Sequence, residues 1–98
     1  MTELRKYNYD IGLEELDFSY NKLTSLPKEF GQLINLQKLR FSNNKIISLP
    51  SELGQLIELK ELKFSYNNII SLPTELGQLI RLQSLSCNNN KLTSIPNE

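Results

Sequence analysis

Few residues in this sequence could serve as catalytic groups. Cys87 is the single cysteine of the chain, and a thiol nucleophile needs a general base, normally histidine, of which the sequence has none. Glu14 and Glu15 are adjacent carboxylates, but neighbouring side chains of an extended segment point to opposite faces, so they do not form an acid–base pair. The chain also lacks the ligands of a zinc site and the glycine spacing of a phosphate-binding loop. We therefore predict a protein that is not an enzyme and that needs no metal or cofactor.

The charges of the chain balance, with 11 Lys and Arg residues against 11 Asp and Glu residues. This balance gives no long-range attraction for nucleic acid or for an anionic membrane surface, so a partner must be recognised through local contacts. A single cysteine excludes a disulfide within the chain, and the sequence has neither the apolar run of a signal peptide nor the roughly 20 apolar residues of a membrane span. These features predict a cytoplasmic protein that binds a protein or a peptide, and neither nucleic acid nor a membrane.

The sequence repeats itself with a period of 23 residues. The stretch LRFSNNKIISLPSELGQLIE begins at Leu39, and LKFSYNNIISLPTELGQLIR begins 23 residues later, at Leu62. A fixed period of this length is typical of a solenoid, in which each unit packs only on its neighbours. The repeat predicts a minimal N-terminal cap at residues 1–12, followed by units at 13–35, 36–58 and 59–81 and a partial unit at 82–98.

Each unit opens with a pattern that predicts a short strand. In the second unit, Leu39 and Phe41 are two residues apart and share one face of a strand, whereas Arg40 lies on the other. A Leu-Pro pair follows, and after it comes the segment Glu-Leu-Gly-Gln-Leu. This segment is too short for more than one or two helical turns. We expect the glycine of this segment, Gly54 in the second unit, to bend the backbone toward the next strand. The pattern predicts parallel strands beginning near residues 15, 38, 61 and 84. The side chains expected to face inward are Leu16, Phe18, Leu39, Phe41, Leu62, Phe64, Leu85 and Cys87.

The recurring Leu-x-x-Leu-x-Phe-x-x-Asn-x-Leu resembles the leucine-rich repeat family over residues 13–98, in its 23-residue intracellular class of Ras-group-like and bacterial proteins. Phenylalanine stands in three units where that family usually has leucine. The resemblance implies an α/β solenoid: a short arc with a concave parallel β-sheet and short helical or 3-10 segments on the convex side. It also implies a scaffold for protein recognition on the concave face. Finally, it implies a ladder of buried amides that satisfy backbone groups where the chain leaves each strand, formed by Asn21, Asn44, Asn67 and Asn90.

Outward-facing strand positions vary between units, so they are where specificity can reside. Read across the strands, one column is Glu15, Lys38, Glu61 and Ser84, and the next is Asp17, Arg40, Lys63 and Ser86. One interpretation is that these residues form ion pairs between neighbouring strands, Glu15–Lys38–Glu61 and Asp17–Arg40. A compatible alternative is a docking surface, because tyrosine and arginine are over-represented among binding hot spots. The predicted partner-binding residues are Tyr20, Lys38, Arg40, Asn43, Lys63 and Tyr66.

The fourth unit stops before its helical return, which leaves its apolar row without a following unit. Its strand edge, from Leu85 to Asn88, also has no proline or lysine to block pairing. These features predict a homodimer in which two such edges pair antiparallel about a two-fold axis. The predicted self-association residues are Leu82, Leu85, Cys87, Leu92 and Ile95.

Three functions follow from these patterns. The leading one is a non-enzymatic protein–protein interaction scaffold that holds its partner on the concave strand face. The alternatives are a self-associating structural repeat unit and the targeting fragment of a larger enzyme.

Overall fold

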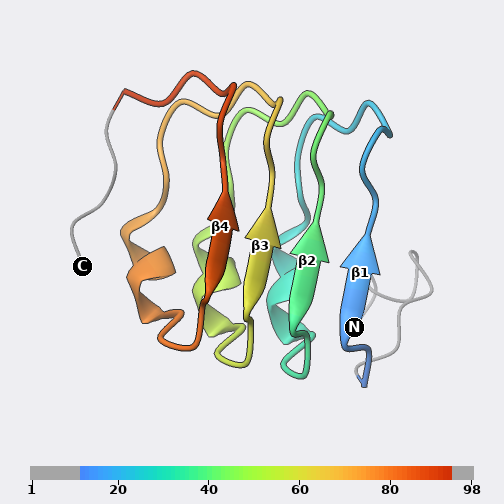
Figure 1. Ribbon diagram of the computed structural model, residues 1–98, viewed down its shortest axis with the longest axis vertical. Helices are drawn as coiled ribbons and strands as arrows, with labels where there is room; N and C mark the ends of the chain where they lie inside the picture. The colour runs from blue at the N-terminus through green and yellow to red at the C-terminus, as the bar shows by residue number, and fades with distance from the viewer. Residues whose placement is uncertain (1–11, 94–98) are drawn as a thin grey trace.

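The structure is a row of short parallel strands backed by short helical turns (Figure 1). The computed structural model describes residues 12–93, so most of the predicted N-terminal cap and the last residues of the fourth unit, including Ile95, lie outside the described residues. The strands pair in the order β1-β2-β3-β4, with Leu16, Leu39, Leu62 and Leu85 in register. Their bounds are β1 (Glu15–Asp17), β2 (Lys38–Arg40), β3 (Glu61–Lys63) and β4 (Ser84–Ser86). The predicted parallel strands and their positions are therefore confirmed.

The convex side of the array is formed by 3-10 turns, and in Figure 1 they lie behind the strands. They are η1 (Lys28–Gln32), η2 (Ser51–Gln55) and η3 (Thr74–Gln78). A proline precedes each turn, and its ring restricts φ to a value compatible with the first turn of a helix, −70° at Pro50. The predicted short helical segments are thus confirmed, and all three described ones have 3-10 geometry.

The hydrophobic core fills the space between the sheet and the turns. Leu39, Phe41, Leu62 and Phe64 are fully buried. The phenylalanine rings stack from unit to unit, with ring centroids 5.7 Å apart for Phe18 and Phe41 and 5.4 Å apart for Phe41 and Phe64. Offset stacking at this separation is favourable beyond the burial of apolar area. The phenylalanines therefore form a continuous column that joins three successive units.

The predicted inward position of the last strand's side chains is only partly realised. Leu85 is 46% exposed, although Leu62, its counterpart in β3, is fully buried. Cys87 takes the place of phenylalanine in the column and is half-buried. The difference arises because no described strand lies beyond β4.

The repeated glycines lie in the turns that lead back toward the next strand, but the structure gives a different reason for glycine there than conformational freedom. None of the described glycines has a positive φ. Instead, a Cβ atom at Gly31 would lie 2.6 Å from the Glu52 carbonyl oxygen, and one at Gly54 would lie 2.5 Å from the Glu75 carbonyl oxygen. Both distances are too short for any side chain, so glycine allows each turn to pack against the next. A Cβ at Gly77, in η3, would meet nothing within 4 Å.

Two further observations concern residues 12–93 alone. In this part of the chain, no helix is long and apolar enough to cross a membrane. Nor do these residues contain a cluster of acidic and cysteine side chains that could hold a metal ion.

Candidate functional site

A column of asparagines, of which Asn44 and Asn67 are buried, fixes the backbone where each strand ends. Asn44 Nδ2 donates to the carbonyl oxygens of Phe41 at 2.9 Å and Phe18 at 3.3 Å. Its Oδ1 accepts from the backbone N–H groups of Asn21 at 3.0 Å and Leu23 at 2.9 Å. One amide thus satisfies backbone groups of two successive units. The ladder implied by the resemblance is present in the structure and consists of Asn21, Asn44, Asn67 and Asn90.

The residue before each ladder asparagine lies in the left-handed region of backbone conformation. The φ values are 63° at Tyr20, 59° at Asn43, 61° at Tyr66 and 59° at Asn89. Asparagine adopts this region readily, whereas for tyrosine it costs about 1–2 kcal/mol. The two tyrosines are also exposed, at 78% for Tyr20 and 53% for Tyr66. The fold therefore holds two tyrosines in a strained and exposed position that asparagine fills in the other two units.

Sequence reasoning missed this strain. A signal was available in the sequence, since tyrosine alternates with asparagine in this column. Asparagine is enriched among residues with positive φ, so its presence indicates that backbone conformation. Tyr20 and Tyr66 follow the ends of β1 and β3, which are two strands apart, or roughly 10 Å at the usual strand spacing. Asn43 lies between them. The three predicted residues of this column therefore lie close together, just beyond the C-terminal ends of neighbouring strands.

Charged side chains cover the strands β1, β2 and β3 themselves. Lys38 Nζ lies 3.9 Å from Glu15 Oε2, which confirms the predicted pair of these two residues. Arg40 Nε donates to Glu61 Oε2 at 2.6 Å, and Lys63 Nζ lies 3.9 Å from the same oxygen. The three predicted cations thus lie on neighbouring strands, and each has a carboxylate partner.

Two of the predicted ion pairs, Asp17–Arg40 and Lys38–Glu61, do not form among the described residues. The register places Arg40 between Asp17 on β1 and Lys63 on β3, but its guanidinium reaches diagonally to Glu61. Asp17 is occupied locally, because its Oδ1 accepts a hydrogen bond from the Ser19 N–H at 3.0 Å. Glu61 is therefore the central residue of the charged cluster, a role that its column alone did not indicate.

Hydrogen bonding favours the ionised forms of these groups. The hydrogen bond from Arg40 lowers the pKa of Glu61 below its ordinary value of 4.5 and raises the pKa of Arg40 itself. The backbone N–H of Ser19 is the main cause that lowers the pKa of Asp17. The surface therefore carries both signs of charge at neutral pH.

The Glu61 pair predicts a specific dependence of stability on pH. A carboxyl group whose pKa is lower in the folded state contributes stability above its unfolded pKa, and this contribution is lost as the pH falls through the folded pKa. We expect the unfolding free energy of the wild type to fall more steeply below about pH 4.5 than that of Glu61→Gln. Thermal unfolding from about pH 3 to pH 7 measures this difference. Parallel curves for the two proteins would show that the pair adds nothing to stability.

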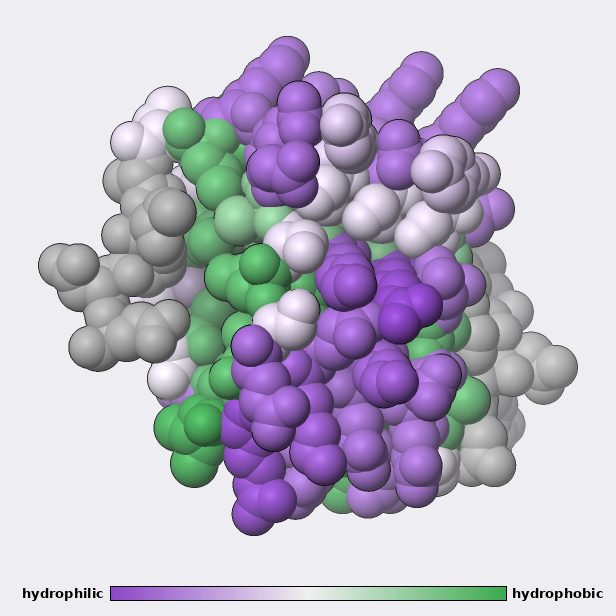
Figure 2. Space-filling model, viewed as in Figure 1, coloured by the Kyte–Doolittle hydropathy of each residue, from purple (hydrophilic) through white to green (hydrophobic). Residues whose placement is uncertain are grey.

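Two surfaces of different character result from this arrangement. Figure 2 shows hydrophilic side chains gathered over the strands and hydrophobic ones at the side of the array next to β4. We define the strand face as the six predicted partner-binding residues, Tyr20, Lys38, Arg40, Asn43, Lys63 and Tyr66, together with Glu61. The predicted self-association residues lie in the hydrophobic region around β4. Among the described residues they are Leu82, Leu85, Cys87 and Leu92.

Comparison with known proteins identifies this architecture. The sequence model described as "Leucine Rich repeats (2 copies)" matches residues 11–55, 34–74 and 57–97. The chain is similar to a leucine-rich repeat protein of Leptospira interrogans, with 38% identity and a TM-score of 0.70 over 88% of this chain and 28% of that one. It is also similar to a chain in the crystal structure of the BIR3–SERK2 complex from Arabidopsis thaliana, with 35% identity and a TM-score of 0.77 over 86% of this chain and 47% of that one.

This chain therefore spans less than half the length of either solved relative. No curated protein matches it at a significant level. The matched repeats cover nearly the whole sequence, in phase with the strands, the turns and the asparagine ladder. The chain belongs to the leucine-rich repeat family.

Proposed function

We propose that the chain is a non-enzymatic module that binds a protein or a peptide across its strand face. Leucine-rich repeat domains generally mediate protein–protein interactions, and one of the similar structures is that of a protein complex. The observation that carries the proposal is the pair of tyrosines held exposed at positive φ. The fold imposes this positive φ in all four units, so tyrosine in place of asparagine is a cost without a structural benefit. Strain of this kind concentrates at binding sites.

The charged cluster supports the same role. Arg40 is held by its Nε bond to Glu61, which fixes the guanidinium on the surface while its side chain remains 42% exposed. No described residue binds its Nη groups, so these donors are available for a carboxylate or a carbonyl of a partner. A side chain that is already ordered loses less entropy when a partner binds. Tyrosine anchors beside a fixed arginine are the combination that dominates many protein interfaces.

The repeat itself supplies the variant that tests this proposal. Asparagine occupies the tyrosine position in two of the units, so Tyr20→Asn/Tyr66→Asn removes both rings with a residue that suits the backbone. We expect the double variant to lose at least tenfold in affinity, or about 1.4 kcal/mol, for a partner captured and identified from the native cells. Its stability should be unchanged or higher by about 1–2 kcal/mol, because the strain is relieved.

Two comparisons complete the experiment. Ile57→Asn removes an exposed apolar side chain outside the strand face, so it should leave capture unchanged. The triple variant Arg40→Ala/Lys63→Ala/Tyr66→Ala should also abolish capture while its stability stays within about 1–2 kcal/mol of the wild type. Undiminished binding by a folded Tyr20→Asn/Tyr66→Asn variant would place the partner on another surface.

A further inference from the structure

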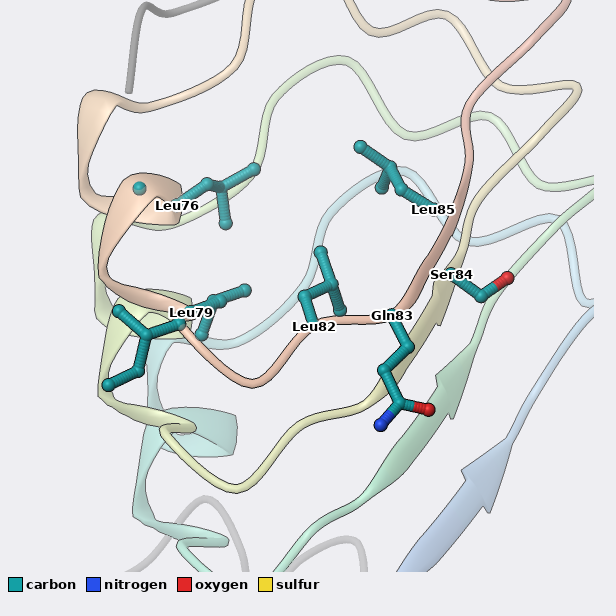
Figure 3. Close-up of a pocket in the computed structure, with 8 residues that line it drawn as sticks. Leu76, Leu79, Leu82, Gln83, Ser84 and Leu85 are labelled. Atoms are coloured by element: carbon teal, nitrogen blue, oxygen red, sulfur yellow. The ribbon is translucent and has the colours of Figure 1, made fainter.

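The outward side chains of the four strands are unevenly charged from one end of the sheet to the other. β1 carries two carboxylates, Glu15 and Asp17. β2 and β3 together carry three cations and one carboxylate, whereas β4 carries only the hydroxyls of Ser84 and Ser86. Figure 3 shows the Ser84 side chain pointing away from Leu85. The outward surface of the sheet is therefore negative over β1, positive over β2 and β3, and neutral over β4.

This unevenness is concentrated in one row of residues, which we name the Asp17 row. It is formed by the outward residues at the C-terminal ends of the strands, Asp17, Arg40, Lys63 and Ser86. Arg40 and Lys63 are cations directly opposite each other on neighbouring strands, an arrangement that destabilises a sheet. The charges of the adjacent row alternate in sign, from Glu15 through Lys38 to Glu61. The Asp17 row thus carries a like-charge contact that the rest of the sheet avoids.

One carboxylate serves both cations of the Asp17 row. Glu61 Oε2 accepts from Arg40 Nε at 2.6 Å and lies 3.9 Å from Lys63 Nζ, which is too far for a hydrogen bond. The Glu61 side chain is only 18% exposed, and both cations are more exposed than it is. An excess of one positive charge therefore remains at the surface between β2 and β3. The free donors of Arg40 and Lys63 suit a second carboxylate.

Asp17, at the β1 end of the same row, is an anion without an ion-pair partner among the described residues. Its Oδ1 accepts from the Ser19 N–H at 3.0 Å, and this bond lowers the pKa of the carboxyl group, which is ionised at neutral pH. Arg40, its neighbour in the row, binds Glu61 instead. The row therefore presents an anion on one strand and an excess of positive charge on the next two.

The spacing of these charges matches that of alternate residues in an extended chain. Alternate side chains of such a chain lie on one face, roughly 6.8 Å apart. Neighbouring strands are about 4.8 Å apart, so the point midway between β2 and β3 lies about 7 Å from β1, and β4 lies about 14 Å from it. A segment that crosses the strands along the row therefore places residue i over Asp17, residue i+2 over the two cations and residue i+4 over Ser86.

We propose that the partner of the strand face is an extended protein segment that bears a lysine or arginine and, two residues away along the chain, an aspartate or glutamate. The cation of the segment lies over Asp17, and its carboxylate binds Arg40 and Lys63. The tyrosines of the strand face supply affinity, whereas the charges set the register and exclude other partners. A nucleic acid lacks the cation that suits Asp17, and a purely acidic peptide places a like charge there. This inference rests on the function proposed above and adds the charge order of the partner.

Selection from a random peptide library tests the charge order. The probe is a set of random peptides displayed on phage and captured by the immobilised full chain. We expect the captured peptides to be enriched in opposite charges two residues apart, and their capture to be at least tenfold weaker with Tyr20→Asn/Tyr66→Asn. Peptides that need both tyrosines but lack this charge pair would overturn the inference and leave the proposed function standing. Peptides whose capture does not need the tyrosines, or no capture at all, would contradict both.

Charge-removing variants locate each contact. Asp17→Asn keeps an oxygen for the Ser19 N–H, and Lys63→Gln leaves the bond between Arg40 and Glu61 in place, so both variants should fold. We expect Asp17→Asn to weaken the binding of a selected peptide roughly threefold to tenfold, and to have no effect once the cation of the peptide is replaced by glutamine. Lys63→Gln should behave in the same way toward the carboxylate of the peptide.

The matched controls remove the same charges just outside the row. Glu14 and Lys60 are exposed and immediately precede β1 and β3. Glu14→Gln and Lys60→Gln should change the affinity for the selected peptide less than about twofold. Additive effects of the protein and peptide substitutions would contradict the proposed register. Controls as damaging as Asp17→Asn and Lys63→Gln would contradict it as well.

Discussion

Replacing Asn67 by alanine is expected to lower the free energy of unfolding by about 3–4 kcal/mol, a large share of the total stability of a domain of this size. Asn67 Nδ2 donates to the carbonyl oxygens of Phe41 at 3.1 Å and Phe64 at 3.0 Å, and its Oδ1 accepts from the Ile46 N–H at 3.1 Å. The two carbonyls keep a second donor from the neighbouring ladder asparagines, but the buried N–H of Ile46 loses its partner. A buried donor without a partner costs about 1–3 kcal/mol, and each lost hydrogen bond adds about 0.5–1.5 kcal/mol.

The first ladder residue provides the matched control. Asn21 is exposed, and its Nδ2 donates only to carbonyls of its own unit, those of Phe18 at 2.7 Å and Ser19 at 3.1 Å. Asn21→Ala should therefore cost about 1 kcal/mol, because water can replace the lost bonds. Urea unfolding of both variants measures the difference. Equal losses at the two positions would mean that the ladder does not join successive units.

Replacing Gly54 by alanine should destabilise the fold by about 1–3 kcal/mol, the usual cost of overpacking. The added Cβ would lie 2.5 Å from the backbone oxygen of Glu75, 2.9 Å from Gln78 Oε1 and 3.0 Å from Glu75 Cβ. The glutamine side chain can move away, but the Glu75 carbonyl belongs to the next turn. Relief of the contact therefore requires η2 and η3 to separate.

The same substitution at Gly77 is the control, since its sequence context is almost identical and its Cβ would meet nothing within 4 Å. Gly77→Ala should be neutral or slightly stabilising, because alanine reduces the conformational entropy of the unfolded chain. If Gly54→Ala were as harmless as Gly77→Ala, close packing would not be the reason for the repeated glycine.

The sequence by itself determined the elements that recur with the repeat. Alternation over two residues identified the buried face of each strand, and the period placed β1 to β4 side by side with Leu16, Leu39, Leu62 and Leu85 in register. The same reasoning placed the six partner-binding residues on one face, because residues in equivalent positions of a solenoid form rows. Whether these residues bind a partner is a proposal that the strand-face variants test.

Only the tertiary structure decided how side chains of neighbouring units interact. A row specifies which residues are adjacent, but the long side chain of Arg40 can reach Asp17, Glu61 or neither. It binds Glu61 because of the rotamers of both side chains and because Asp17 is already bound to Ser19. The positive φ of Tyr20 arises because the amides of the next unit hold the chain where it leaves the strand. The exposure of Leu85 and the empty space at Gly77 are also tertiary, since burial depends on the neighbouring unit and these residues repeat sequences that are buried elsewhere in the chain.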